Sequence, residues 1–149
     1  MIVVVGLALL LLGGFFRVTS IRHFTVYFRE ISLSGLQPDS AVTMRGLRVG
    51  KVSRLEFVLR DVEQIRVVLE LAKDTPVRVD TRAIIQRNLL TGVASVDLVG
   101  ARQSAPELSH ILPGEEFPVI PQGSSNFEQL EASLPDFIEQ ATLPAQGVS

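Results

Sequence analysis

Gly46, Gly50 and Lys51 lie in the stretch RGLRVGKV (45–52), and these residue types could form a phosphate-binding loop. A P-loop places four residues between its glycines and a Ser or Thr after its lysine, whose hydroxyl binds magnesium. Here three residues separate the glycines, and Val52 follows the lysine. The residues that follow alternate like a strand, whereas a P-loop opens a helix that holds the phosphate. The spacing therefore argues against nucleotide hydrolysis.

The same two glycines have a structural explanation. Gly46 separates two strand-like segments, at a turn where a positive φ is readily available only to glycine. Gly50 falls inside the second segment, where a glycine usually marks a bulge or a close approach of two backbones. The stretch therefore predicts a tight hairpin followed by a bent strand, as in a small barrel.

The other polar residues form no pattern typical of catalysis or metal binding. The chain has no cysteine, and its two histidines, His23 and His110, are far apart, so no thiolate or HxxxH site is predicted. The net charge of −2 gives no electrostatic case for nucleic acid. We therefore expect no enzyme activity, metal or cofactor. Solvated or capping positions near turns explain four carboxylates: Asp61, Glu63, Asp74 and Asp80.

About seven short strands are predicted, with turn residues between them and no long amphipathic helix. The 149 residues suffice for one ordinary domain. This pattern is typical of an all-β barrel or sandwich, and a closed barrel avoids open sheet edges. In the third strand, alternation would place Val52 on one face and Leu55 on the other. The predicted strands are 24–31, 41–46, 49–59, 65–71, 81–89, 93–99 and 115–120.

Residues 2–16, IVVVGLALLLLGGFF, form an unbroken apolar run. As a helix it would span roughly 22 Å, short of the roughly 30 Å hydrocarbon core of a bilayer. Nothing basic precedes the run and no Ala-x-Ala site follows it, which favours a transmembrane anchor over a cleaved signal peptide. We therefore expect an anchor and linker at 1–21, a barrel at 22–121 and a C-terminal helical segment at 122–149.

The C-terminal segment shows helical spacing. Ser125 lies three residues before Glu128, which is the arrangement of a capping box. An apolar stripe on this helix could pack between copies of the chain, and the alternative is that it folds back onto its own domain. The stripe contains Phe127, Leu130, Leu134, Phe137 and Ile138.

The stretch VYFREISLSGLQPDSAVTMRGLRVGKVSRLEF resembles the opening of an MCE (mammalian cell entry), or MlaD-like, domain. The later stretches IRVVLELAKDTPVRVDTRAIIQRNLLTG and ILPGEEFPVIP are similar to the middle and closing strands of that family. The resemblance covers residues 24 to about 121. The matching positions in the first stretch are Gly35, Leu36, Val42, Gly46, Val49, Gly50 and Val52.

The resemblance implies a seven-stranded barrel that assembles into a homohexameric ring with a central hydrophobic pore. Such rings transport phospholipids or other lipids between membranes, together with an ABC permease and ATPase, and perform no chemistry themselves. It also implies a single-pass protein of the inner membrane, with the MCE domain in the periplasm or an equivalent space. The apolar residues of the C-terminal segment would continue the lipid path.

By the same resemblance, the pore would be lined by the loop NLLTG (88–92). Leu90, Thr91 and Gly92 match the family, but Leu89 stands where the family usually has glycine, and leucine resists a positive φ. Two adjacent leucines in a turn cannot both face one barrel's core, so an exposed pair calls for a partner or an apolar ligand. The alternative is that both leucines plug the end of the barrel.

A second hypothesis is an anchored, monomeric β-sandwich with a structural or adhesive role in the cell envelope. The two hypotheses differ at the loop. In a sandwich, charges at Leu89 and Leu90 would destabilise the fold, whereas in a ring they would leave the fold intact and impair transport.

Overall fold

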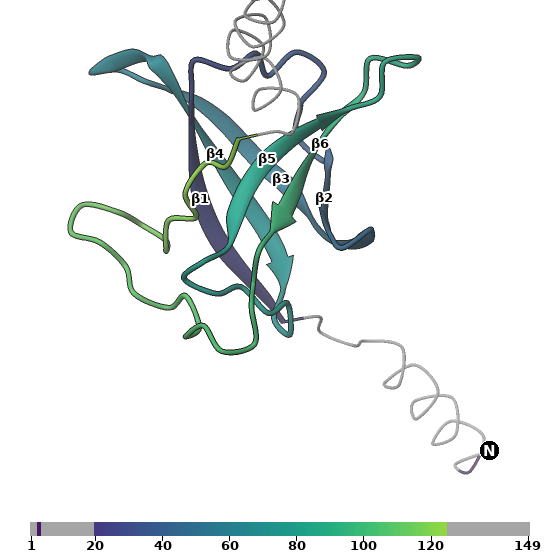
Figure 1. Cartoon of the computed structure of the whole chain (residues 1–149), viewed down its shortest axis with the longest axis vertical. Coiled ribbons are helices and arrows are strands. Elements are labelled where there is room, and N and C mark those ends of the chain that lie inside the picture. Colours follow the sequence, from purple (N-terminus) through teal and green to yellow (C-terminus); the bar gives the residue numbers. More distant parts are fainter. Residues whose placement is uncertain (1–2, 4–19, 125–149) are drawn as a thin grey trace, which may run out of the picture.

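The computed structural model describes residue 3 and residues 20–124 (Figure 1). Within those residues, no helix has the length and apolar character needed to cross a membrane. The apolar run at 2–16 lies almost wholly outside the described residues, so the predicted anchor stays a prediction. The predicted C-terminal helix, which carries Phe127, Leu130, Leu134, Phe137 and Ile138, also lies outside them.

The described part of the chain is all-β, as predicted, and its six strands form one sheet. The order in the sheet is β1-β4-β3-β2-β6-β5, and only the β2–β6 pair is parallel. A sandwich needs two packed sheets, so the β-sandwich fold of the second hypothesis is wrong. The strands are β1 (Ile21–Arg29), β2 (Ala41–Met44), β3 (Leu47–Val58), β4 (Asp61–Ala72), β5 (Arg82–Arg87) and β6 (Ala94–Val99).

The first six predicted strands are confirmed with shifted ends. β1 begins at Ile21 rather than at Phe24, because Ile21 pairs with Ala72 at the end of β4. β4 begins at Asp61, where a turn was expected. The turn there is only Leu59 and Arg60, so the β3–β4 hairpin projects beyond the neighbouring strands (Figure 1).

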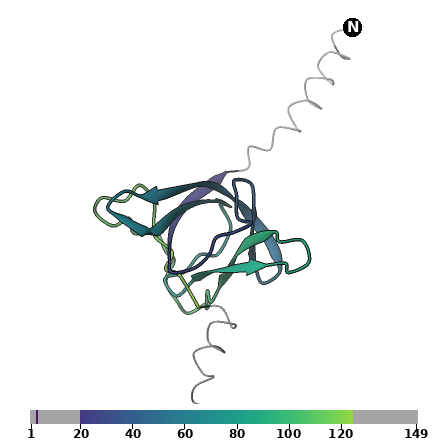
Figure 2. The same ribbon diagram turned by 90° about the horizontal axis from the view of Figure 1, so that it is seen from above.

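The seventh predicted strand, 115–120, is wrong. In its place, residues 118–123, which we call the closing segment, make one bridge to each edge of the sheet. Thr25 of β1 donates its N–H to the Pro118 carbonyl at 2.9 Å, and Ala83 of β5 donates to the Pro121 carbonyl at 3.0 Å. Proline lacks an N–H, so two prolines in six residues prevent a continuous ladder. Seen from above, the ribbon nevertheless runs around a ring (Figure 2).

The core fills the inside of this ring with alternate side chains of each strand. Phe24, Val26 and Phe28 of β1 are at most 1% exposed. This period of two is what a sheet with one buried face requires. The other strands and the closing segment contribute Val42, Val52, Val67, Leu69, Leu71, Ala83, Ile85, Ala94, Val96, Leu98 and Ile120.

The predicted single alternation along 49–59 is wrong because β3 contains a bulge. Val52 pairs with Leu69, but the next pair is Arg54 with Val68, so one residue of β3 is skipped. Such a bulge moves the side chains that follow to the other face. Val52 and Leu55 therefore both pack on the core, although the spacing placed them on opposite faces.

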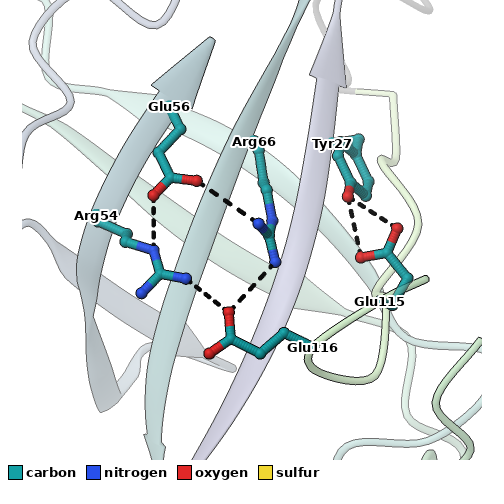
Figure 3. Close-up of polar contacts among 6 residues, drawn as sticks. All are labelled: Tyr27, Arg54, Glu56, Arg66, Glu115 and Glu116. Carbon is teal, nitrogen blue, oxygen red and sulfur yellow. Dashed lines mark hydrogen bonds and ion pairs between the residues drawn. The ribbon is translucent and has the colours of Figure 1, made fainter. Parts of the chain in front are cut away.

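Polar side chains hold the loop before the closing segment against the outside of the sheet (Figure 3). Arg54 of β3 binds Glu56 at 2.9 Å and Glu116 at 2.8 Å. Arg66 of β4 lies 3.6 Å from Glu56 and 3.7 Å from Glu116. Partly exposed ion pairs contribute at most about 1 kcal/mol each, so this network mainly fixes the position of the loop.

A second contact fixes the same loop on β1. The hydroxyl of Tyr27 donates to the Glu115 carboxylate, with oxygens at 2.8 and 2.9 Å (Figure 3). Burial raises the pKa of Tyr27 above its ordinary value, and the hydrogen bond to Glu115 raises it further. The hydroxyl therefore stays protonated and continues to donate over the neutral range. His23 stacks on Phe117 with ring centroids 5.0 Å apart, which places His23 in a packing role.

Candidate functional site

The loop between β5 and β6, residues 88–93, is organised around Asn88. The Asn88 side-chain oxygen accepts from the N–H of Leu90 at 2.9 Å and of Thr91 at 3.2 Å. The Asn88 carbonyl accepts from Gly92 at 2.8 Å, and its own N–H donates to the Val93 carbonyl at 2.9 Å. Asparagine favours turns because its side chain can replace missing backbone partners in this way. One residue therefore fixes most of the loop backbone.

Leu89 and Leu90 stand at the tip of this loop and point into solvent. They are 91% and 97% exposed, and Val93 beside them is 61% exposed. The alternative that the leucines plug the barrel end is therefore wrong. A folded chain that presents two adjacent leucines in this way offers an apolar surface for a partner or ligand.

The loop accommodates leucine at position 89 without strain. Among the described residues, Leu89 is not one of the non-glycine residues with positive φ. The left-handed conformation falls instead on Gly92, at φ 72°. The departure from the family pattern therefore adds apolar surface and leaves the turn unstrained.

The connection between β1 and β2 packs against the base of the 88–93 loop. Arg87 donates to the carbonyls of Ser32 at 3.0 Å and Ser34 at 3.2 Å. Gly35 has φ 84°, and a Cβ there would overlap the Gly92 carbonyl oxygen. Ala94 also donates its N–H to the Gly35 carbonyl at 3.2 Å. The leucine tip is thus held on a rigid base.

Sequence reasoning missed the residues that position this loop. Asn88 directly before a turn was a usable signal, because Asn is typical of such positions. Nothing local marks Arg87 or the packing of Gly35 against Gly92, since those partners lie more than fifty residues away in the sequence.

The remaining predicted positions lie elsewhere. Gly46 has φ 81° in the β2–β3 turn, and a Cβ on Gly50 would overlap the Glu70 carbonyl of the neighbouring strand. Gly50 also lies beside a register shift between β2 and β3. Among the residues that the structure describes, no three His, Asp or Glu side chains are grouped to hold a metal ion.

These observations define a curled six-stranded sheet whose two edges are bridged by the closing segment and which exposes an apolar loop at one end. The chain belongs to the MlaD protein family, which matches residues 22–101. The resemblance to an MCE or MlaD-like domain is thus confirmed. Among solved structures, the chain is similar to a chain of the Acinetobacter MlaFEDB complex in its ATP-bound Vtrans1 conformation. The TM-score is 0.50 at 14% identity, over 89% of this chain and 93% of that one. No curated protein matches the sequence.

Proposed function

We propose that this chain is a membrane-anchored subunit of an ABC-type system that transports phospholipid or another lipid between membranes. Six copies form a ring, and the 88–92 loops meet at its axis to make a hydrophobic pore. The run at 2–16 anchors each copy in the inner membrane, and the barrel lies in the periplasm or an equivalent space. A permease and an ATPase supply the transport cycle.

Membership of the MlaD family supports this assignment, as does a fold shared with a chain of an MlaFEDB complex that binds ATP. Nothing in the nucleotide-like stretch at 45–52 could hydrolyse ATP, so a partner subunit must do so. In this proposal the apolar residues Phe127, Leu130, Leu134, Phe137 and Ile138 extend the lipid path beyond the ring.

The exposed pair Leu89 and Leu90 is the observation that carries the proposal. The two side chains are nearly fully exposed on a loop whose backbone is held by Asn88 and Arg87. Exposing an apolar tip to water is unfavourable in free energy. Six tips around one axis would shield one another from water. The space between them would accept acyl chains, because neither Leu89 nor Leu90 carries a polar group.

Crosslinking tests whether the 88–92 loops of neighbouring copies meet. The chain has no cysteine, so a single introduced thiol reports without background. Leu90→Cys in the full-length protein, solubilised in detergent and treated with a short bismaleimide, should give covalently linked dimers, because each copy supplies one thiol. Leu59→Cys is a matched control, because Leu59 is also in a turn and is 95% exposed. Equal crosslinking of the two variants, or none at position 90, would contradict the proposal.

A further inference from the structure

The barrel end where β1 begins also exposes a leucine, Leu47. Ile21, the first residue of β1, lines a shallow depression together with Arg48 and Lys51 of β3. β2 runs parallel to β6, so the turn after Met44 lies at the opposite end of the barrel from the loop before Ala94 (Figure 1). We call the end with Ile21 and the β2–β3 turn the N-terminal end.

The β2–β3 turn presents an apolar side chain between two cations. Arg45 and Gly46 both have positive φ, at 52° and 81°, which is the pattern of a tight hairpin turn. Leu47 follows and is 71% exposed. Arg45 and Leu47 also line a groove with Val49 and Arg78.

Three arginines of this end have no carboxylate partner in the part of the chain that the structure describes. Within residues 20–124, Arg45, Arg48 and Arg78 take part in no ion pair. Asp80 is at the same end, but its carboxylate is already bound by Arg102 at 2.9 Å. The N-terminal end therefore offers free positive charge beside an exposed leucine.

The sequence before β1 limits what this end can face. The apolar run ends at Phe16, five residues before Ile21, and five extended residues span at most about 18 Å. If the run is embedded in a bilayer, the N-terminal end must lie close to the headgroup layer. This step rests on the anchor in the proposed function.

We propose that the β2–β3 turn rests on the membrane surface and binds anionic phospholipid headgroups. Leu47 enters the boundary between headgroups and acyl chains, and the guanidinium groups of Arg45 and Arg48 bind lipid phosphates. Arginine suits this position because its apolar stem can lie along lipid while its head binds phosphate. The contact sets the height and tilt of each barrel above the bilayer.

A protein partner fits this turn less well than a bilayer does. A stable protein interface buries about 800 Å² on each side, whereas this turn offers one exposed leucine among cations. A fluid headgroup layer can close around a single apolar side chain and supplies many phosphates.

Depth-dependent quenching tests the proposal on the full chain. Leu47→Cys and the control Leu59→Cys, at the far end of β3, would each carry a polarity-sensitive fluorophore. The protein would be reconstituted in vesicles of phosphatidylcholine and phosphatidylglycerol that contain a lipid with a headgroup nitroxide. We expect the label at position 47 to be quenched and that at position 59 to stay unquenched.

Neutral variants give the second arm of the test. Each arginine near an anionic surface contributes about fivefold to the docked population, so Arg45→Gln with Arg48→Gln should lower docking about 25-fold. Vesicles of phosphatidylcholine alone should give a similar loss of quenching. Unchanged quenching, both in the glutamine variant and in phosphatidylcholine vesicles, would overturn the role of headgroup charge.

The outcomes separate this inference from the anchor on which it rests. If the protein fails to float with the vesicles, the anchor is wrong and the inference falls with it. If the protein floats but position 47 is quenched no more than position 59, only the inference is wrong. A spectral shift at position 47 without nitroxide quenching would mean that another protein surface covers the turn, and this too would overturn it.

Discussion

Two turns at opposite ends of the barrel expose leucines in different chemical settings. The β2–β3 turn presents Leu47 between Arg45 and Arg48, whereas the β5–β6 loop presents Leu89 and Leu90 between the neutral residues Asn88 and Thr91. Cations beside an apolar side chain suit a surface that offers both phosphate and hydrocarbon. An apolar pair without charges suits acyl chains alone.

The two turns also differ in how firmly they are held. A Cβ on Gly46 would meet nothing within 4 Å, so no other segment packs closely against the turn at this position. The β5–β6 loop is capped by Asn88 and packed against Gly35. A turn without close packing at its tip can adapt to a fluid surface, while a loop packed at its base keeps its shape.

The largest expected effect is on the free energy of unfolding, when Gly35 and Gly46 are each replaced by alanine in separate variants. Gly35→Ala should destabilise the fold by about 3 kcal/mol, because its Cβ would overlap the Gly92 carbonyl in addition to the strain of a positive φ. Gly46→Ala should cost only about 1 kcal/mol, the strain alone. Urea unfolding of both variants measures the difference. Equal losses in the free energy of unfolding would mean that Gly35 is packed no more closely than Gly46.

A smaller effect is expected from the cap. Asn88→Ala removes the acceptor for the N–H groups of Leu90 and Thr91, and should cost about 1 kcal/mol. Hydrogen exchange at these two amides should accelerate while the β2–β3 turn is unaffected. Asn88→Asp keeps the acceptor and serves as the control. Unchanged exchange in Asn88→Ala would show that the loop is held by other contacts.

The smallest effect concerns pH at the N-terminal end. The hydrogen bond from the Arg102 side chain holds the pKa of Asp80 below its ordinary value, and the Arg102 backbone N–H adds to this. A depressed pKa in the folded state contributes stability above the unfolded pKa, and that contribution is lost as pH falls below about 4. Asp80→Asn should flatten the acid side of the stability profile. An equally steep profile in the variant would assign the acid sensitivity to other carboxylates.

Local sequence patterns were enough to predict the β2–β3 hairpin turn and the exposed tip of the β5–β6 loop. Gly46 between two alternating segments predicted the tight hairpin, and adjacent leucines in a turn predicted an exposed tip. Residues 115–120 were predicted as a strand from their β-forming residues, yet Pro118 and Pro121 decide how the closing segment pairs. The bulge after Val52 and the packing of Gly35 depend on partners distant in sequence, which no local pattern reveals.

Native mass spectrometry of the full-length protein in detergent tests the central claim most directly. The account predicts a hexamer that carries phospholipid, and a Leu89→Asp, Leu90→Asp variant that keeps its folded barrel but loses the lipid. Surface substitutions of this kind change stability by only about 0.5 kcal/mol, so the loss of lipid would not reflect unfolding. A monomer without lipid, or a variant that binds lipid as the unmodified chain does, would contradict the account.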